Sequence, residues 1–249
     1  MTLSVPPERS EEARAVMIEL FPAGFEEREG DAGVDLTAYT DRPDAVARLE
    51  PLGNVSESPV AEGWEDAWKA FHKPVRIGPL WIGPPWESAD AGSTPIVIDP
   101  GQAFGTGAHA TTRLCIELLL EVTPAGLVDL GCGSGVLAVA AAKLGFSPVV
   151  ALDNDGRAVA ATCENAAANV VEVDARHADA LVDPLPEVDV AVANIARAPV
   201  ERAIERFEGR IAIVSGYLEV EQPAPRGWQP VERRRRGGWA ADLLVRTPD

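Results

Sequence analysis

Two glycine-rich stretches lie close together in the middle of the chain. Residues 103–112 read AFGTGAHATT, and residues 127–136 read LVDLGCGSGV. Glycine tolerates a positive φ and has no Cβ, so a backbone rich in glycine can approach a bound ligand closely. Either stretch alone could be a tight turn. The pair, so close in the sequence, indicates one ligand that is held from two sides.

The second stretch has the order of a nucleotide-binding loop. A short apolar run, 127–130, leads into GCGSG at 131–135 and then into an alanine-rich segment that reads as a helix. A strand, a glycine loop and a helix in this order place a ligand at the carboxyl end of the strand. Asp153 ends the next predicted strand, 22 residues after Gly131. A carboxylate at that place can accept two hydrogen bonds from a ribose diol.

Two classes of cofactor share this geometry. Dinucleotide-binding folds prefer G-x-G-x-x-G, where the helix N-terminus meets a pyrophosphate. Here Asp129 begins an acidic-x-Gly-x-Gly-x-Gly pattern, which resembles the class I S-adenosylmethionine-dependent methyltransferases. Their cofactor has no phosphate, so the loop need only let methionine and ribose lie against bare backbone. We expect Asp129 either to order the loop or to meet the cofactor's ammonium group through water; NAD binding and a structural loop are the alternatives.

The first stretch lacks the G-K-[ST] ending of a phosphate-binding loop, which disfavours an ATPase. It supplies a helix N-terminus instead, with backbone N–H groups at His109 to Thr112 and hydroxyls at Thr111 and Thr112. Unpaired donors and the helix dipole stabilise a carboxylate at such a place. The methionine end of S-adenosylmethionine carries a carboxylate. We therefore expect this stretch to close over one side of the cofactor while the second stretch supports the other.

A third polar position ends the segment VDVAVAN, which is predicted to be the fourth strand of a sheet. Asn194 would lie there at the ligand edge and face the transferred methyl group. Its amide oxygen could accept N–H bonds from a neutral amine, and such positioning supplies much of the catalysis in an in-line displacement. The alternative is a strand-end cap. Asp179, after the third strand, could similarly meet the adenine amino group or be a solvated acid.

Composition and charge narrow the class of protein. The chain has 249 residues, of which 46% are hydrophobic, and its charge balance is 22 − 39 = −17. This excess of acid disfavours direct nucleic-acid binding and suits a basic partner, although it also serves solubility alone. No run of eighteen apolar residues and no secretory signal is found, so we expect a cytoplasmic protein without a membrane span. The three cysteines form no CxxC pair, and His72 and His177 have no metal-ligand spacing, so no metal is expected.

Alternating helices and short apolar runs predict an α/β fold from about residue 109, with a parallel sheet covered on both faces. The four arginines at 233–236 are predicted to form a solvated hairpin. The predicted elements follow in chain order. Helices are expected over 109–121, 135–144, 156–168 and 199–206, and strands over 127–130, 148–153, 170–173, 188–195, 210–216 and a closing pair within 228–246.

The first sixty residues predict a small α+β unit. Ser10 is expected to cap a helix with apolar residues at i, i+3, i+4 and i+7. Residues 34–39 alternate in polarity as a half-buried strand does, and a short helix is expected from Pro43 to before Pro51. An amphipathic helix with an aromatic stripe is predicted over 61–72, followed by proline-rich chain with short extended pieces. We therefore predict three parts: a domain over 1–60, a linker helix and lead-in segment over 61–94, and a ligand-binding domain over 95–249.

Four motifs in this order resemble the ribosomal protein L-11 methyltransferase family (PrmA): IDPGQAFGTGAHATT, VDLGCGSGV, ALDND and VANIA. The segment GWEDAWKAFHKP also resembles that family's interdomain linker. The resemblance implies a Rossmann-like, seven-stranded class I methyltransferase domain preceded by a small α+β substrate-recognition domain. It further implies S-adenosylmethionine as cofactor and a basic ribosomal stalk protein as partner, methylated on lysine side chains and its N-terminal amine. We expect a monomer.

The resemblance also assigns residues to the site. Asn194 is the predicted catalytic residue. The chain departs from the family's His-His-Glu-Thr-Thr pattern, because Ala108 and Ala110 flank His109, and a helix expected before residue 228 is reduced or absent. Both departures concern the substrate side, so a methyltransferase acting on another protein lysine or a small amine, or a cofactor-binding protein without catalysis, are the alternatives. The predicted cofactor contacts are Phe104, Thr106, Thr112, Asp129, Gly131, Gly133, Asp153 and Asn194.

Overall fold

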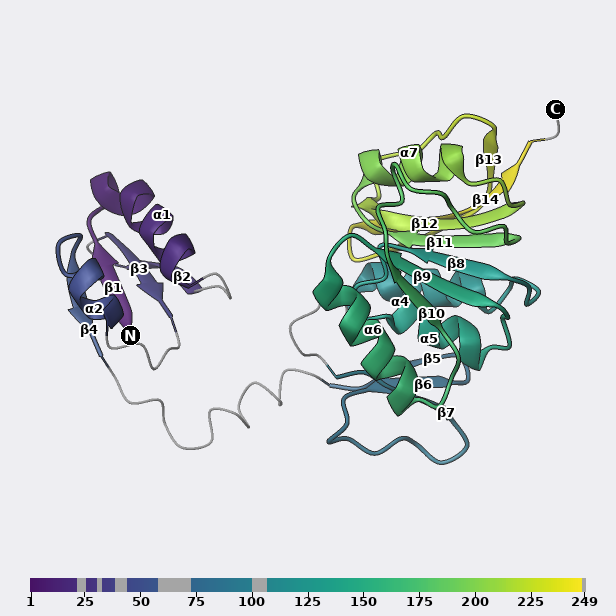
Figure 1. Ribbon diagram of the computed structural model, residues 1–249, viewed down its shortest axis with the longest axis horizontal. Coiled ribbons are helices and arrows are strands. Elements are labelled where there is room, and N and C mark those ends of the chain that lie inside the picture. The colour runs from purple at the N-terminus through teal and green to yellow at the C-terminus, as the bar shows by residue number, and fades with distance from the viewer. Residues whose placement is uncertain (22–25, 31–32, 39–43, 58–72, 100–106, 248–249) are drawn as a thin grey trace. The chain divides into compact units, whose positions relative to one another are not determined.

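The structure is a computed structural model of the 249-residue chain. It describes residues 1–21, 26–30, 33–38, 44–57, 73–99 and 107–247. The chain divides into two compact units, Met1–Trp68 and Lys69–Asp249 (Figure 1). The domain boundaries predicted after residues 60 and 94 stay predictions, and the predicted aromatic helix over 61–72 lies outside the described residues.

The smaller unit is an antiparallel sheet with helices packed on it, as predicted. Its strand order is β2-β3-β1-β4, and the apolar side chains of both helices are buried against Leu3, Val5 and Leu36. The predicted cap at Ser10 is wrong: Ser10 is the first helical residue, and its hydroxyl donates to the Pro7 carbonyl at 2.9 Å. The elements are β1 (Thr2–Val5), η1 (Pro7–Arg9), α1 (Ser10–Leu20), β2 (Glu26–Gly30), β3 (Gly33–Thr37), α2 (Asp44–Leu49) and β4 (Asn54–Ser56).

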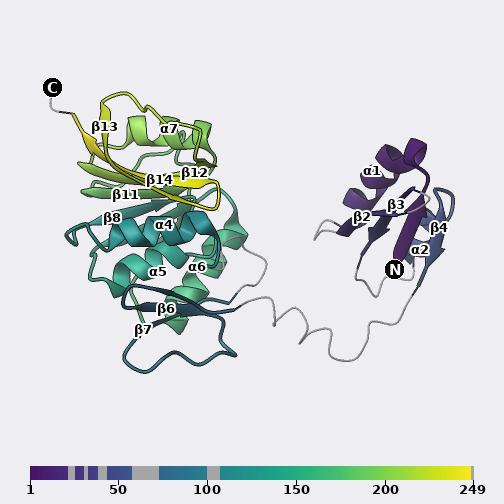
Figure 2. The ribbon, with the colours of Figure 1, turned by 180° about the vertical axis from the view of Figure 1, so that it is seen from behind.

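The larger unit begins with a three-stranded sheet formed by the predicted extended pieces. It comprises β5 (Val75–Ile77), β6 (Leu80–Gly83) and β7 (Thr94–Val97) in the order β5-β6-β7. Its buried isoleucines and Leu80 belong to the same apolar core as the helices that follow. Seen from behind, those helices lie between this small sheet and the main sheet (Figure 2).

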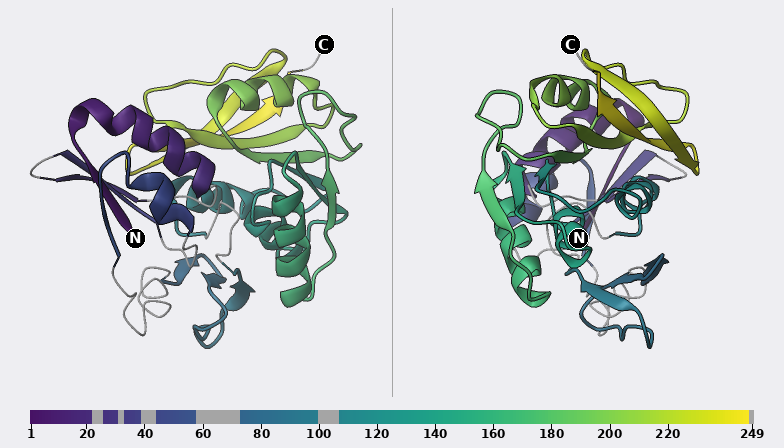
Figure 3. Two further views of the ribbon diagram at one scale, coloured as in Figure 1. Left: turned by 60° about the vertical axis from the view of Figure 1, so that its left-hand side comes forward. Right: turned by 90° about the vertical axis from the view of Figure 1, so that its right-hand side faces the viewer.

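Seven strands form the main sheet, in the order β10-β9-β8-β11-β12-β14-β13. The pairs from β10 to β12 are parallel, and β14 runs antiparallel between β12 and β13. The hairpin β13–β14, in yellow, continues the sheet beyond β12 (Figure 3). The predicted seven-stranded Rossmann-like fold is confirmed. The strands are β8 (Leu127–Leu130), β9 (Val149–Asp153), β10 (Asp174–His177), β11 (Val190–Asn194), β12 (Ile211–Leu218), β13 (Trp228–Arg236) and β14 (Trp239–Arg246).

Helices cover both faces of this sheet. One face carries α4 (Ala110–Leu119), α5 (Val136–Lys143) and α6 (Gly156–Ala168), and the other carries α7 (Arg197–Arg206). Residues 136–141 of α5 are all buried, because this helix lies between the main sheet and the small one. A helix buried on every side has no polar face, which explains its run of alanine and valine. In the described part of the chain, no helix is long and apolar enough to cross a membrane.

One sequence prediction in this unit is wrong. The strand predicted over 170–173 lies later, at β10, because Val170 terminates the α6 turn at φ 54° with its side chain 91% exposed. The hairpin predicted at the arginine run is present, because the run ends β13 directly before the turn into β14. Arg235 and Arg236 are exposed there, although Arg234 pairs with Glu232 and Glu121 and Arg236 with Glu117 of α4. The connection 219–227, which the structure describes in full, contains no helix, as the sequence predicted.

Candidate functional site

A cavity of about 390 Å³ opens at the carboxyl ends of β8, β9, β10 and β11. In open α/β sheets, ligands bind at this edge, where the strand order reverses. Five of the eight predicted cofactor contacts line the cavity together, and Asp179 lines it too. Phe104 and Thr106 lie outside the described residues. The five are Thr112, Gly131, Gly133, Asp153 and Asn194.

The glycine loop after β8 presents bare backbone to this cavity. Gly131, Gly133 and Gly135 all have positive φ, at 80°, 54° and 78°, which a side chain would strain. A Cβ at Gly131 would also lie 2.4 Å from a methyl carbon of Ile195. The backbone N–H of Gly131 donates to the Leu152 carbonyl of β9 at 2.8 Å. The loop is therefore tied to the neighbouring strand in a shape that needs its glycines.

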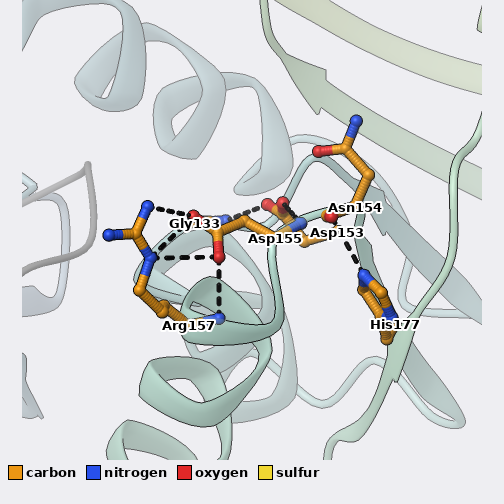
Figure 4. Close-up of polar contacts among 6 residues, drawn as sticks. All are labelled: Gly133, Asp153, Asn154, Asp155, Arg157 and His177. Atoms are coloured by element: carbon orange, nitrogen blue, oxygen red, sulfur yellow. Dashed lines mark hydrogen bonds and ion pairs between the residues drawn. The ribbon is translucent and has the colours of Figure 1, made fainter.

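Asp153 holds the turn between β9 and α6 (Figure 4). Its Oδ2 accepts from the Gly133 N–H at 3.0 Å and its Oδ1 accepts from the Asp155 N–H at 2.9 Å. Asp155 in turn caps α6, because its Oδ1 accepts from the Arg157 N–H at 2.9 Å. Each oxygen of a carboxylate has two lone pairs, so each oxygen of Asp153 can accept one further hydrogen bond.

Asn194 and Thr112 meet across the cavity wall. The Asn194 Nδ2 donates to Thr112 Oγ1 at 3.4 Å, and this bond does not use the amide oxygen. His109 is the N-cap of α4, with Nδ1 at 2.7 Å from Thr111 Oγ1 and its ring edge-on to Trp239 at 5.0 Å. His109 therefore caps a helix and packs against the β13–β14 hairpin, whereas Thr112 reaches the cavity from the same helix start.

Asp129 lies beneath the glycine loop rather than in the cavity lining. Its side chain is buried, its Oδ2 accepts from the Ala138 N–H at 3.1 Å, and its Oδ1 has no partner in the described part of the chain. Burial raises the pKa of Asp129 to about 7. Since Ala138 is in the first turn of α5, this geometry favours loop ordering over the water-mediated contact with ammonium, which stays a prediction.

The sequence reasoning missed the polar face of α6. Thr162 donates to the Gly133 carbonyl at 3.2 Å, and Asn165 Nδ2 donates to the Ser134 carbonyl at 2.9 Å. The Asn165 Oδ1 also accepts from the Asp99 N–H at 3.0 Å. One buried amide thus joins the glycine loop to the chain that follows β7. A sequence signal for these contacts exists. Polar residues stand at i, i+3 and i+7 along a helix that packs on the core: Thr162, Asn165 and Asn169.

Metal ligation has no support among the described residues. No group of three or more histidine, cysteine, aspartate or glutamate side chains there is placed to hold an ion. The His177 ring nitrogen Nε2 lies 2.9 Å from the Asn154 carbonyl (Figure 4), and His72 lies outside the described residues. Cys115 and Cys132 are buried and Cys163 is exposed, all as free thiols.

The fold and the cavity together define a class I S-adenosylmethionine-dependent methyltransferase. The sheet order, the glycine loop preceded by Asp129, and Asp153 at the end of the next strand agree with that class. Residues 28–246 match the family described as Ribosomal protein L11 methyltransferase (PrmA). The chain belongs to this ribosomal protein L11 methyltransferase family, whose methyl donor is S-adenosylmethionine.

Individual relatives agree with this membership. The ribosomal protein L11 methyltransferase of Symbiobacterium thermophilum is 41% identical over 201 residues, which cover 74% of this chain and 66% of the relative. That of Pelobacter propionicus is 38% identical over 251 residues, covering 84% and 80%. The crystal structure of a ribosomal protein L11 methylase from Lactobacillus delbrueckii subsp. bulgaricus has a TM-score of 0.64 at 31% identity, covering 70% of this chain and 99% of that one.

Asp129 predicts a pH dependence of stability. Its pKa in the folded protein, about 7, lies above the value of about 3.9 for an unfolded chain, so the folded state binds this proton more tightly. Its contribution is fully present below about pH 4 and is lost as the pH rises through about 7. Between pH 5 and 8 we expect the free energy of unfolding, from urea titrations, to fall more in the wild type than in Asp129→Asn. Parallel pH profiles would contradict the burial of a protonated carboxyl here.

Asn165 predicts a loss of cofactor affinity for which Asn169 is a matched control. Both amides are buried, Asn165 in α6 and Asn169 as its C-cap, and both bond to the β7 segment, but only Asn165 bonds to the glycine loop. Replacing either by alanine should cost about 1–3 kcal/mol of unfolding free energy, because buried backbone partners are orphaned. Only Asn165→Ala should weaken S-adenosylmethionine binding, by about tenfold in calorimetry. Equal affinity losses in both variants would mean that the effect is general loosening.

Proposed function

We propose that this protein transfers methyl groups from S-adenosylmethionine to amines of ribosomal protein L11. One observation carries the proposal: Thr112, Asp153 and Asn194 line a single cavity in a chain of the L11 methyltransferase family. The relatives named above are called L11 methyltransferases. The acceptors would be lysine side chains and the N-terminal amine, which a sulfonium methyl group alkylates.

Along the edge of the sheet, the cavity has room in succession for the methionine portion, the ribose and the base of the cofactor. The ends of β11 and α4 place Asn194 and Thr112 at one side, β9 places Asp153 in the middle, and residues 178–181 follow β10 at the other side. A ribose on Asp153 would put the methionine portion toward the start of α4, whose dipole favours a carboxylate. The base would then lie against residues 178–181, where Asp179 could accept from its amino group.

The chemistry asks for orientation more than for acid–base groups. Bound S-adenosylmethionine supplies an electrophilic methyl carbon. The Asn194 amide oxygen would accept an N–H bond from the incoming neutral amine and aim its lone pair at that carbon, and such positioning lowers the barrier of a displacement. The amine loses its proton more readily in a site that is desolvated and adjoins a positive sulfonium. The released proton passes to solvent.

Charge and architecture support a basic protein as the acceptor. A net charge of −17 attracts a basic substrate and repels a nucleic-acid backbone. We infer a cytoplasmic monomer that binds neither nucleic acid nor membrane directly. We further infer that residues 1–60 are the substrate-recognition domain, residues 61–94 the linker segment, and residues 95–249 the catalytic domain. An apolar core of its own, with Leu3, Met17 and Leu36 fully buried, supports independent folding of the first part.

Asp153 and Asp155 form a matched pair for testing the ribose site. Both are acids of the β9–α6 turn that accept a backbone N–H, but only Asp153 lines the cavity. Asp153→Ala should lower S-adenosylmethionine affinity by at least about a hundredfold, because two ribose hydroxyls and the Gly133 N–H lose their acceptor. Asp155→Ala should change stability through the lost cap but leave affinity within about threefold. Calorimetry with each variant measures both, and unchanged affinity in Asp153→Ala would refute the assignment.

Asn194 is tested by turnover on the organism's own ribosomal protein L11. Incubation with wild-type protein and S-adenosylmethionine should raise the intact mass of L11 by whole methyl units. Asn194→Ala should retain cofactor affinity within about threefold and lower kcat by about a hundredfold, because it loses the acceptor that aims the amine. If the wild type binds the cofactor but leaves the L11 mass unchanged, the acceptor is another amine or the protein only binds the cofactor.

A further inference from the structure

One wall of the cofactor cavity is a single turn, residues 179–183, that follows β10. Asp179 is the first residue of this turn and accepts hydrogen bonds from the residues that follow it. The Asp179 Oδ1 accepts from the Leu181 N–H at 2.8 Å, and the Asp179 carbonyl accepts from the N–H groups of Val182 and Asp183 at 3.1 and 2.9 Å. Asp179, Ala180 and Leu181 line the cavity. The turn therefore resembles the start of a helix that does not continue, and such a turn leaves carbonyls without partners.

Arg206 supplies the missing donors from another element. It is the last residue of α7, and its guanidinium donates to the carbonyls of Ala180, Val182 and Asp183, the last two at 3.1 and 2.9 Å. Arginine can bond several acceptors at once because its N–H groups form a rigid fork. One side chain thus caps three carbonyls of this turn.

This cap fixes the orientation of Asp179. The peptide unit between Ala180 and Leu181 is held on both sides, since its carbonyl accepts from Arg206 and its N–H donates to Asp179 Oδ1. Without Arg206 that peptide unit can rotate, and the bond that orients the Asp179 carboxylate is lost with it. Asp179 lines the cavity at the side where the base of a nucleoside cofactor would lie.

We propose that Arg206 is a positioning residue that sets the base preference of the cofactor site, by holding Asp179 as acceptor for the exocyclic amino group of adenine. The proposal rests on the proposed function, which places the base at this wall. A carboxylate held in this way attracts an amino group and repels a carbonyl oxygen at the same position. Hypoxanthine carries an oxygen there, so a rigid Asp179 discriminates between the two bases, whereas a loose one does not.

Arg210 provides a matched control. It is also an exposed arginine, it lines the same surface pocket as Arg206, and its Nε donates to Asp189 Oδ1 at 2.9 Å. Among the described residues its recorded partner is this carboxylate and not the turn 179–183. Replacing Arg210 by alanine removes the same charge as replacing Arg206, so a difference between the two variants isolates the capping of the turn.

The experiment compares the affinities of S-adenosylhomocysteine and S-inosylhomocysteine by calorimetry in four proteins: wild type, Arg206→Ala, Arg206→Lys and Arg210→Ala. The wild type and Arg210→Ala should favour the adenine ligand by at least about tenfold. The preference should fall below about threefold in Arg206→Ala and be partly restored in Arg206→Lys, since a lysine can reach some of the carbonyls. At saturating cofactor, the kcat of Arg210→Ala should stay within about twofold of the wild type, because this variant touches neither Asn194 nor the turn 179–183.

Each outcome decides one statement. An undiminished preference for adenine in both Arg206 variants overturns the proposal, and so does an equal loss of preference in Arg210→Ala. A wild type that binds both ligands equally overturns the role of Asp179 and the proposal with it. A wild type that binds neither ligand overturns the proposed function instead. Should Arg206→Ala fail to fold, as judged by its melting curve, Arg206→Lys still decides. The ammonium group of lysine lacks the fork of an arginine and bonds fewer of the carbonyls. A full wild-type preference for adenine in Arg206→Lys therefore overturns the proposal.

Discussion

The reversal of chain direction beside β8 is the constraint on which the rest of the site depends. From β8 the chain passes through α5 and α6 to β9 and β10 on one side, whereas β11 and β12 lie on the other side and are joined through α7. Connections that leave a parallel sheet in opposite directions open a crevice at the carboxyl ends of the strands. The glycine loop, Asp153 and Asn194 come from three different strands and share one cavity because each follows a strand that ends at this crevice.

Loops that present bare backbone to a ligand have polar groups that need partners on their other side. Helices behind the loops supply them here. Asn165 of α6 bonds the glycine loop, Arg206 of α7 bonds the turn after β10, and Asp129 of β8 bonds the start of α5. The two walls of the cavity are thus held by opposite faces of the sheet, one through α6 and the other through α7. Each loop is therefore held by hydrogen bonds within the protein, which reduces the ordering that opposes ligand binding.

The fold and the centre of the site could be predicted from the sequence because their signals are local. Glycines with positive φ, an acid at a strand end and Asn194 after an apolar run each stand within a few residues of the strand that positions them. Asn165 belongs to a polar stripe visible in the sequence, but its partner and those of Arg206 could not be found that way, since they lie 31 and 23 to 26 residues away and are decided by strand order. The strand predicted over 170–173 failed for a different reason. Its valines favour a strand, but β-branched residues also occur where a helix ends, and here they follow the end of α6.

Helix α4 explains how the short, helix-free connection before β13, a departure from the family pattern, is accommodated. Its first turn carries Thr112 and its last turn carries Glu117, and Glu121 follows just beyond its end. Both glutamates pair with arginines of β13. Individual surface ion pairs contribute little, but a network of several charges with shared partners is stronger. At the other end of α4, His109 packs against Trp239 of the same hairpin. The hairpin therefore contacts both ends of α4, the helix that brings Thr112 to Asn194. These contacts hold α4 in place, so the cavity keeps its geometry although the connection before β13 contains no helix.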